Sequence, residues 1–463
     1  MTALSPQPLS PLDGRYRRQT GTLDQHLSEA GLNRARIHVE VEWLIHLTDR
    51  ELLGARRLTD AEKSLLRALP ENFGDGDVAA LAEREAVTRH DVKAVEYHVR
   101  DHLAVIGLGE IAELTHVACT SEDINNLAYA ITIRDAVAAE WMPAVRAVIE
   151  ALRERALEWR DVPMLSHTHG QPATPTTMGK EFAVVVHRLE RLVASVHEIE
   201  YLGKFSGATG TFAAHVAADP DHDWPASSKD FVESLGLTWN PLTTQIESHD
   251  WQAQLYQRIA HVGRVLHNLC TDIWTYISMG YFRQIPQPGA TGSSTMPHKI
   301  NPIRFENAEA NFELSAALLD SLAATLVTSR LQRDLTDSSA QRNIGVALGH
   351  AMLALDNVYK GLGEIALDAD ALARDLNDNW EVLGEAIQTV IRAEVTSGHS
   401  TISDPYALLK ELTRGHRVGG DELRAFVDGL DISDAAKARL RELTPATYTG
   451  LAGDLVRFIA REN

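Results

Sequence analysis

The loop over residues 289–302 places six reactive side chains within nine residues, namely Ser293, Ser294, Thr295, His298, Lys299 and Asn301. Glycines make the first half of the loop flexible, and prolines stiffen the second half. A glycine-rich arm of this kind can close over a substrate, exclude water and deliver a hydroxyl. An ammonium and an amide can then hold carboxylate oxygens. The alternative is an ordinary polar loop before a helix that begins near Pro302, which composition alone favours.

Two histidines, His167 and His169, alternate in the segment over residues 166–174, which reads Ser-His-Thr-His-Gly-Gln-Pro-Ala-Thr. Alternation on a short strand would suit a metal pair. No cysteine or spaced set of histidine and aspartate nearby completes a coordination shell, however. An imidazole in this setting is better interpreted as a general acid or base, because histidine titrates near neutral pH without strong tuning. A metal-dependent hydrolase built on these two histidines is the alternative.

Two further segments combine arginines with the start of a helix. Residues 88–92 include Arg89 and His90, where backbone N–H groups would add to their charge in an anion site. Residues 329–342 include Arg333, Ser338 and Arg342, a set suited to cradle a phosphate. A capped or charged surface helix is the alternative at both positions.

Residues 119–126 combine a helix start with residues that disfavour helix. Thr120 or Ser121 followed by acidic residues is typical of an N-cap and first turn. A cap needs no asparagine pair, and Asn125 and Asn126 are poor helix formers. Such a mismatch is typical of a functional site.

Composition restricts the class of protein. The 463 residues carry 44 Lys and Arg against 64 Asp and Glu, a formal net charge of −20, which argues against general binding to nucleic acid or to an anionic membrane. Any phosphorylated substrate must therefore meet a local basic cluster. Only two cysteines, no secretory signal and no apolar stretch of membrane-spanning length predict a soluble, cytoplasmic protein. The glycine-rich segment 203–210 lacks the Gly-Lys-Ser/Thr ending of a P-loop.

Long helices dominate the predicted secondary structure. Apolar residues recur every three or four positions over 255–277, 182–199, 312–327, 344–362 and 114–159. Pro143 lies inside the last of these ranges and should kink or divide that helix. Strand-like alternation is scarce, and residues 162–168 are the best candidate. Helices with such apolar stripes pack side by side within a chain or between subunits.

Shifts in composition suggest three domains. Residues 1–110 mix short helices with charged turns, residues 111–362 hold the long helices, and residues 363–463 return to short charged helices. No period of 20–50 residues repeats, which argues against a solenoid.

The loop over 292–302, Gly-Ser-Ser-Thr-Met-Pro-His-Lys-Ile-Asn-Pro, resembles the signature loop of the fumarase/aspartase superfamily of lyases. Other segments narrow the resemblance to the adenylosuccinate lyase family; these are residues 13–16, 90–92, 120–123, 168–174, 244–247 and 333–338. The likeness extends from residue 13 to residues 445–448, so it covers almost the whole chain. It is nearest to the bacterial branch, which has Met-Pro-His-Lys in the loop.

The resemblance implies an all-α subunit of three domains whose central helices form a bundle that assembles into a homotetramer. Each active site would draw on three subunits. The implied reactions are elimination of fumarate from adenylosuccinate, giving AMP, and from succinyl-aminoimidazole-carboxamide ribotide, giving the carboxamide ribotide, in purine biosynthesis. The implied ligand is a small nucleotide, with no cofactor and no metal.

The resemblance also assigns residue roles. Ser293 matches the general base and His169 the general acid. Lys299 and Asn301 match residues at the succinyl carboxylates, and Ser294 matches a loop neighbour that contacts substrate. The nucleotide- and phosphate-contacting positions correspond to Arg15, Tyr16, His90, Asp91, Thr120, Ser121, Gln245, Asn307, Arg333, Ser338 and Arg342. Arg89 stands where relatives are expected to have a smaller polar residue.

The implied chemistry agrees with these residue types. A β-elimination must remove a weakly acidic C–H proton and protonate a departing nitrogen. An imidazolium at His169 can donate to nitrogen near neutral pH, and Lys299 can stabilise the carbanion's charge in a closed, dry site. A serine is a poor base unless its anion is stabilised, so Ser293 has to depend on Lys299 and on N–H groups of its loop.

Two other classes of protein stay open at this point. One is a different lyase or cycloisomerase of the same superfamily that acts on another succinyl-type substrate, for which Arg333, Ser338 and Arg342 would have no phosphate to bind. The other is a helical assembly protein that has lost catalysis, which would be expected to lack the loop residues or His169.

Overall fold

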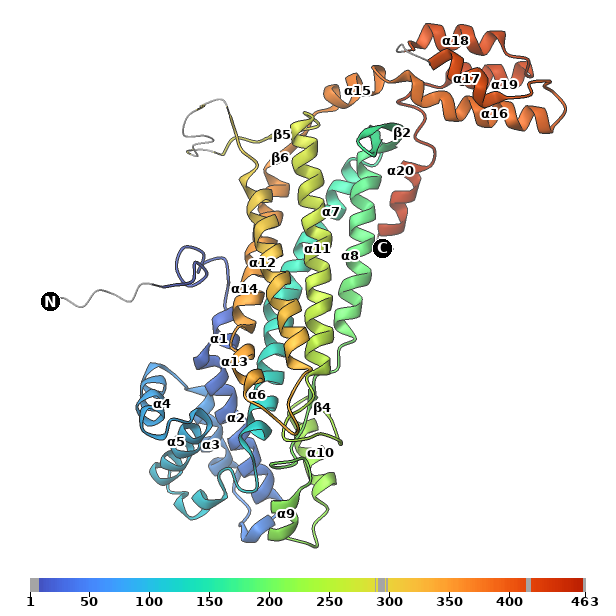
Figure 1. Ribbon diagram of the computed structural model, residues 1–463. Coiled ribbons are helices and arrows are strands. Elements are labelled where there is room, and N and C mark those ends of the chain that lie inside the picture. Colours follow the sequence, from blue (N-terminus) through green and yellow to red (C-terminus); the bar gives the residue numbers. More distant parts are fainter. Residues whose placement is uncertain (1–7, 288, 290–295, 297–298, 414–417, 461–463) are drawn as a thin grey trace. The chain divides into compact units, whose positions relative to one another are not determined.

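The computed structural model describes residues 8–287, 289, 296, 299–413 and 418–460, and these are mostly helical (Figure 1). The chain divides into two compact units. Unit 1 comprises Met1–Val145, Leu192–Arg264 and Ala310–Asp356, and unit 2 comprises Arg146–Arg191, Val265–Glu309 and Asn357–Asn463. Long helices contribute one segment to each unit; they are α7 (Met142–Glu158), α8 (Met178–His197), α11 (Asp250–Ser278), α12 (Ile303–Leu326) and α14 (Ile344–Gly363).

Unit 1 contains the N-terminal helices, which gather around α2 (Glu29–Asp49) (Figure 1). An apolar core that includes Ile37, Leu44, Val95 and Leu103 joins α2 to its neighbours. The other helices and strands of unit 1 are α1 (Leu23–Leu27), α3 (Asp60–Glu71), α4 (Asp75–Thr88), α5 (Asp91–Val105), α6 (Ser121–Ala136), β3 (Leu202–Gly203), α9 (Ala213–Ala218), α10 (Trp224–Ser234), β4 (Thr238–Trp239) and α13 (Thr336–Gln341). Strands β3 and β4 pair in parallel. Short 3₁₀ helices occupy Leu52–Gly54 and Gly109–Leu114.

The helix expected over 114–159 is shorter and divided. It begins at Ser121, with Thr120 in the N-cap position, where the Asp123 side chain accepts from the Thr120 N–H at 2.8 Å. A π-helical turn over Val137–Trp141 then separates α6 from α7. Pro143 has no N–H to donate to the carbonyl four residues earlier, which accounts for the irregular turn just before it. The predicted interruption at Pro143 is therefore confirmed.

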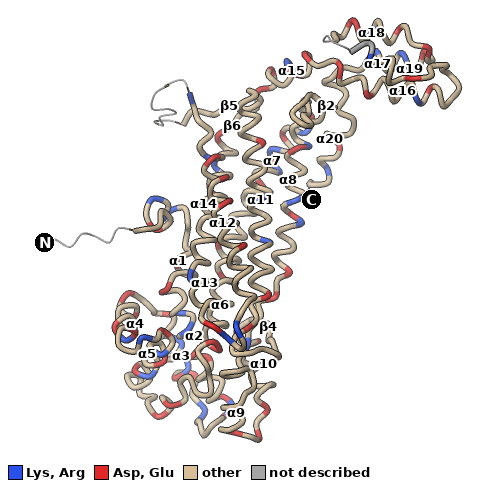
Figure 2. Tube along the Cα trace, viewed as in Figure 1, with Lys and Arg blue, Asp and Glu red and all other residues tan. Residues whose placement is uncertain are grey.

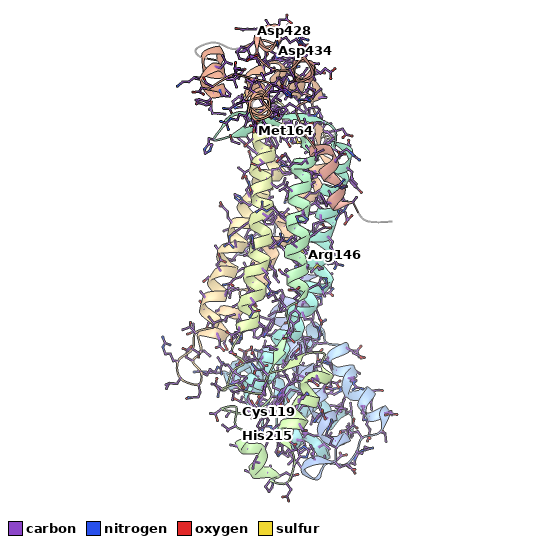
Figure 3. The ribbon with its side chains drawn as sticks, turned by 90° about the vertical axis from the view of Figure 1, so that its right-hand side faces the viewer. Cys119, Arg146, Met164, His215, Asp428 and Asp434 are labelled. Carbon is purple, nitrogen blue, oxygen red and sulfur yellow. The ribbon has the colours of Figure 1, made fainter. Side chains whose placement is uncertain are left out.

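Unit 2 contains a β-hairpin and the C-terminal helices. The hairpin pairs β1 (Pro163–Thr168) with β2 (Gln171–Thr177) in antiparallel register, and Met164 on β1, labelled in Figure 3, is buried. The remaining elements of unit 2 are β5 (Phe282–Gln284), β6 (Ile365–Leu367), α15 (Ala369–Asn377), α16 (Gly384–Thr396), α17 (Pro405–Thr413), α18 (Gly420–Gly429), α19 (Asp434–Glu442), α20 (Ala452–Leu455) and 3₁₀ turns at Trp380–Leu383 and Val456–Ile459. A second apolar core, with Ile387, Val427 and Leu440 among its members, joins α16 to α18 and α19.

The other long-helix predictions agree with the structure. The stripe over 255–277 lies on α11, and its residues from Leu255 to Ile273 are buried. The helix expected near Pro302 begins at Ile303. Strand β1 was predicted, but β2 was not, because Pro172 and Pro175 mask it. Over the described residues, no helix has the length and apolar character needed to cross a membrane.

Candidate active site

One cavity of unit 1, about 510 Å³ in volume, collects residues from three of the segments singled out in the sequence. Six predicted site residues line it: His90, Asp91, Ser121, Arg333, Ser338 and Arg342. Their elements are α5, α6 and the stretch through α13, which lie far apart along the chain. The fold of unit 1 therefore brings together most of the positions expected to contact a nucleotide or phosphate.

The start of α5 supplies His90 and Asp91. Helix α4 ends at Thr88, and Arg89 takes a left-handed conformation with φ of 53° that turns the chain into α5. His90 is the N-cap, and its Nδ1 accepts from the Lys93 N–H at 3.3 Å. Arg89 itself lines the cavity. The prediction of a helix start at this position is confirmed.

Arg333 is held by groups on several sides. Its guanidinium lies 2.8 Å from a carboxylate oxygen of Glu122, donates to Ser338 Oγ at 2.9 Å and to Gln245 Oε1 at 3.5 Å. Gln245 in turn donates to the Ala208 carbonyl at 3.0 Å. Glu122 is only 2 % exposed, and burial raises the pKa of its carboxyl despite the nearby charge of Arg333.

Arg342 is fixed by two carboxylates. It pairs with Glu29 and lies 2.8 Å from Asp91 Oδ2. Burial alone would raise the pKa of Asp91, but the charges of Arg36 and Arg342 and the Val92 N–H hold it below its usual value. Asp91 is therefore an ionised acceptor between two guanidiniums.

Charges of both signs are interspersed over α2 to α6 (Figure 2). The cavity lining likewise holds three arginines, Arg89, Arg333 and Arg342, and the carboxylates of Glu85, Asp91 and Glu122. This arrangement agrees with the expectation that an acidic chain needs a local cluster to hold a phosphate.

The start of α6 is fixed by buried charge. Asp123 accepts from the N–H groups of Thr120, Ser206 and Gly207, and its Oδ1 lies 2.8 Å from Lys204 Nζ; neither of these two charged side chains is exposed. Cys119, labelled in Figure 3, comes directly before this cap. Thr120 and Ser121 are therefore rigidly placed.

The structure explains why two asparagines, which are poor helix formers, stand near the start of α6. Asn126 accepts from the Lys204 N–H at 2.8 Å and donates to the Lys204 carbonyl at 2.9 Å, so it fixes the backbone of that loop. Asn125 lines the cavity and donates to Glu122 at 2.7 Å. Asn126 therefore fixes the backbone next to the site, and Asn125 forms part of the cavity wall.

Arg15 and Tyr16 belong to the N-terminal segment of unit 1 and do not line the 510 Å³ cavity among its described lining residues. The Arg15 guanidinium lies 5.6 Å from the centre of the Tyr16 ring. Leu12 anchors the segment, because it is 6 % exposed and its Cδ1 fills the space beside Gly349. A smaller cavity of about 140 Å³ is lined by Leu12 and Asp13 and also by Arg342.

Unit 2 contains the other predicted residues. His169 and Gly170 form the two-residue turn of the β1–β2 hairpin, with φ of 53° and 71°. Turns of this kind need positive φ at both positions, and they suit the right-handed twist of the strands. The imidazole of His169 is exposed at the tip of the hairpin. Thr174 ties the hairpin to α16 by donating to Glu385 at 2.5 Å.

The residues after the signature loop lead into α12. The Lys299 side chain is exposed, and Asn301 is half-buried with its carbonyl accepting from the Ile303 N–H at 2.9 Å. Asn307 lies one turn into α12 and accepts from Asn357 at 3.0 Å. Ser293 and Ser294 lie outside the described residues.

Sequence reasoning missed several residues behind the cavity. Arg36 is 2 % exposed and bonds to Asp91 and Asn125. His249 is also buried, and its Nε2 lies 3.6 Å from Asp337 Oδ2. Burial lowers the pKa of His249, but Asp337 and Glu247 raise it above the ordinary value. Arg36 lies among apolar residues of a helix and His249 lies in a polar segment before one, and neither pattern carries a signal for such contacts.

Among the described residues, no group of three or more His, Cys, Asp or Glu side chains is arranged to hold a metal ion.

The comparisons with known proteins place this mostly helical chain among the lyases. A family model described as Lyase matches residues 14–312, and one described as Adenylosuccinate lyase C-terminal matches residues 329–449. A solved fumarate lyase from Mesorhizobium sp. BNC1 superposes with a TM-score of 0.74 at 20 % identity, covering 95 % of this chain and 97 % of that one. A 3-carboxy-cis,cis-muconate lactonizing enzyme from Pseudomonas putida gives 0.70 at 20 % identity, covering 95 % and 96 %. These two likenesses show the fold.

Curated relatives narrow the family. An adenylosuccinate lyase of Vibrio cholerae is 45 % identical over 96 % of this chain and 97 % of its own length. Those of Escherichia coli K12 and Legionella pneumophila strain Corby are each 44 % identical, over 97 % and 99 % of both chains, respectively. The chain therefore belongs to the adenylosuccinate lyase family, as the sequence motifs predicted.

Proposed function

We propose that this chain eliminates fumarate from adenylosuccinate, giving AMP, and from succinyl-aminoimidazole-carboxamide ribotide, giving the carboxamide ribotide. The observation that carries the proposal is the pair of guanidiniums, Arg333 and Arg342, in one cavity of a chain whose net charge is −20. Two arginines and the Ser338 hydroxyl are a donor set that suits a phosphate monoester. The relatives named as adenylosuccinate lyases support the same substrate.

In the proposed reaction Ser293 removes the proton from carbon, and His169 donates a proton to the departing nitrogen. Lys299 and Asn301 hold the succinyl carboxylates, so that charge developing on the carbanion meets a fixed cation. Ser294 contacts the substrate, and Asn307 and the residues of the unit 1 cavity hold the nucleotide. Removal of either proton-transfer group should lower turnover by about 10²–10⁴-fold.

The direct test supplies purified protein with adenylosuccinate and measures fumarate and AMP. We expect both products in equal amounts, and the same protein should release fumarate from the carboxamide substrate. Succinyl-adenosine, which lacks the phosphate, should be a much poorer substrate because Arg333 and Arg342 then have no anion to bind. Folded protein that gives neither fumarate nor AMP would refute the proposal, and equal rates on succinyl-adenosine would favour another succinyl-type substrate.

We further propose that the active enzyme is a homotetramer whose active sites are shared between subunits. Ser293→Ala and His169→Ala should each show a near-complete loss of turnover without changing helical content by circular dichroism. If these two residues reach one site from different subunits, random mixing of the two inactive variants restores about one quarter of the sites, because each residue is intact in half of the subunits. If subunit exchange is verified by mass spectrometry and no activity returns, the result argues against sites that combine Ser293 and His169 from different subunits.

The proposal includes a cytoplasmic location, where purine nucleotides are made. Cys119 and Cys270 are free thiols, in keeping with a reducing compartment.

A further inference from the structure

The two arginines of the unit 1 cavity are joined by an unbroken series of side-chain contacts. Arg333 Nη2 lies 2.8 Å from Glu122 Oε1, and Asn125 Nδ2 donates to that same oxygen at 2.7 Å. Asn125 Oδ1 accepts from Arg36 Nε at 2.9 Å. The series therefore leads from a guanidinium in the cavity wall to a buried one behind it.

From Arg36 the series returns to the cavity. Arg36 Nη2 donates to Asp91 Oδ2 at 2.8 Å, and Arg342 Nη2 donates to the same oxygen at 2.8 Å. The third group of Arg36, Nη1, donates to Asn33 Oδ1 at 2.9 Å. All the nitrogens of this side chain are thus committed, and the side chain is 2 % exposed.

We propose that Arg36 is a positioning residue that sets the spacing and orientation of Arg333 and Arg342 for a phosphate group. This inference rests on the proposed function, because it concerns how that site holds its nucleotide. Arg36 does not need to touch the ligand. It acts through Asn125 and Glu122 toward one arginine and through Asp91 toward the other.

The geometry of a guanidinium explains why an arginine occupies this position. Its donors are fixed in one plane, so that a single side chain can bond to Asn125 and Asp91 in two defined directions. A lysine has the same charge, but its three donors radiate from a single nitrogen on a flexible stem and cannot reproduce the fixed, planar directions of the guanidinium. Uncharged replacements would also leave the half-buried Asp91 carboxylate with one guanidinium fewer, so that Arg342 would be its remaining arginine partner among the described residues.

The test measures binding of AMP by calorimetry to wild-type protein and to two variants of the full chain. Arg36→Met should weaken AMP binding by about 10- to 100-fold, the effect of losing a charge-assisted hydrogen bond. Arg36→Lys should weaken it by about three- to tenfold, because the charge is kept while the fixed geometry of the contacts is lost. Binding of adenosine, which lacks the phosphate, should be unchanged in both variants. In turnover assays KM should rise more than kcat falls.

A matched control is Arg153→Met in unit 2. Arg153 is also buried, at 6 % exposure, and it bonds to Glu190 and to the Ile459 carbonyl. This variant loses a buried arginine of equal size, and its AMP affinity should stay within twofold of the wild type.

The outcomes distinguish a failure of the proposed function from a failure of the positioning role of Arg36. Wild-type protein that neither binds AMP nor converts adenylosuccinate would refute the proposed function. Wild-type protein that does both, with Arg36 variants that bind AMP within twofold of it, would refute the positioning role alone. A loss of adenosine binding equal to the loss of AMP binding would also refute it, because a general structural defect would then be the cause. If Arg36→Met does not fold, the result for Arg36→Lys decides.

Discussion

Asp123 and Lys204 form a buried ion pair. Removing one partner or the other should lower the free energy of unfolding by unequal amounts. Asp123→Asn leaves the Lys204 ammonium with one other acceptor, the Gly207 carbonyl at 3.0 Å. Lys204→Met leaves the Asp123 carboxylate with three backbone N–H donors, those of Thr120, Ser206 and Gly207. The carboxylate thus keeps most of its compensation, and the ammonium does not.

The expected magnitudes follow from this difference. Stranding a buried charge costs about 3–5 kcal/mol of unfolding free energy, so Asp123→Asn should lie in that range. Lys204→Met removes one charged partner from an otherwise satisfied carboxylate and should cost about 1–3 kcal/mol. The double variant should cost less than the sum of the two, because no lone ammonium is then buried.

The assay is urea unfolding followed by circular dichroism at one fixed protein concentration, with free energies from linear extrapolation. Asp320→Asn is a matched control, since Asp320 pairs with Arg264 on the surface, with both side chains about half exposed; it should cost no more than about 1 kcal/mol. The reasoning would be refuted if Lys204→Met lowered the free energy of unfolding as much as Asp123→Asn. Additive losses of unfolding free energy in the double variant would refute it as well.

Two other predictions concern each unit in turn. In unit 1 burial lowers the pKa of His116, but Glu40, whose Oε1 lies 2.6 Å from His116 Nδ1, raises this pKa above 6.5. The ion pair of the protonated imidazole with Glu40 therefore stabilises the folded state fully below pH 6.5, and this stabilisation is lost as the pH rises through the raised pKa. His116→Asn should therefore cost about 2 kcal/mol at pH 6 and clearly less at pH 9 by urea unfolding, and an equal cost at both would contradict the assignment. In unit 2 a Cβ on Gly179 would lie 2.4 Å from the Ala156 carbonyl oxygen, so Gly179→Ala should cost about 3 kcal/mol and lower kcat by displacing the His169 hairpin. Gly384→Ala is the control, because a Cβ at Gly384 would have open space around it. Equal thermal stability of the two variants would show that the close contact at Gly179 does not destabilise the protein.

Much of the fold was predictable because apolar periodicity is a local property of the chain. The stripe on α11 and the helix start at Ile303 follow directly from it. The start of α6 was placed too early by periodicity but correctly by the cap at Thr120, since a cap is also local. Strand β2 was missed because its pairing depends on β1 and on a turn whose first residue, His169, is unusual at positive φ. The division into three domains stays a prediction.

The site residues that carry motifs were predictable, and those that support them were not. His90, Arg333 and Arg342 stand in recognisable segments, and the structure brings them to one cavity. Arg36 stands inside a helix between apolar residues, and nothing in its neighbours indicates contacts with residues 55 and 89 positions away. Such long-range partners depend on how helices pack, which one sequence does not specify.

The supporting residues share a physical property that helps to explain why charged side chains occupy these positions. Arg36, Glu122, Asp123 and Lys204 are charged and almost completely buried. Buried ion pairs are a weak source of stability, and apolar residues of similar size often do as well or better. Glu122 lines the cavity, Arg36 contacts its wall through Asn125 and Asp91, and Asp123 and Lys204 fix the start of α6. Their presence is therefore better explained by the fixed directions that charged groups impose on their neighbours. A chain selected for stability alone would have filled these positions with leucine or methionine. Arg333 would then have lacked the Glu122 carboxylate, and Asp91, which holds Arg342, would have lacked the Arg36 guanidinium.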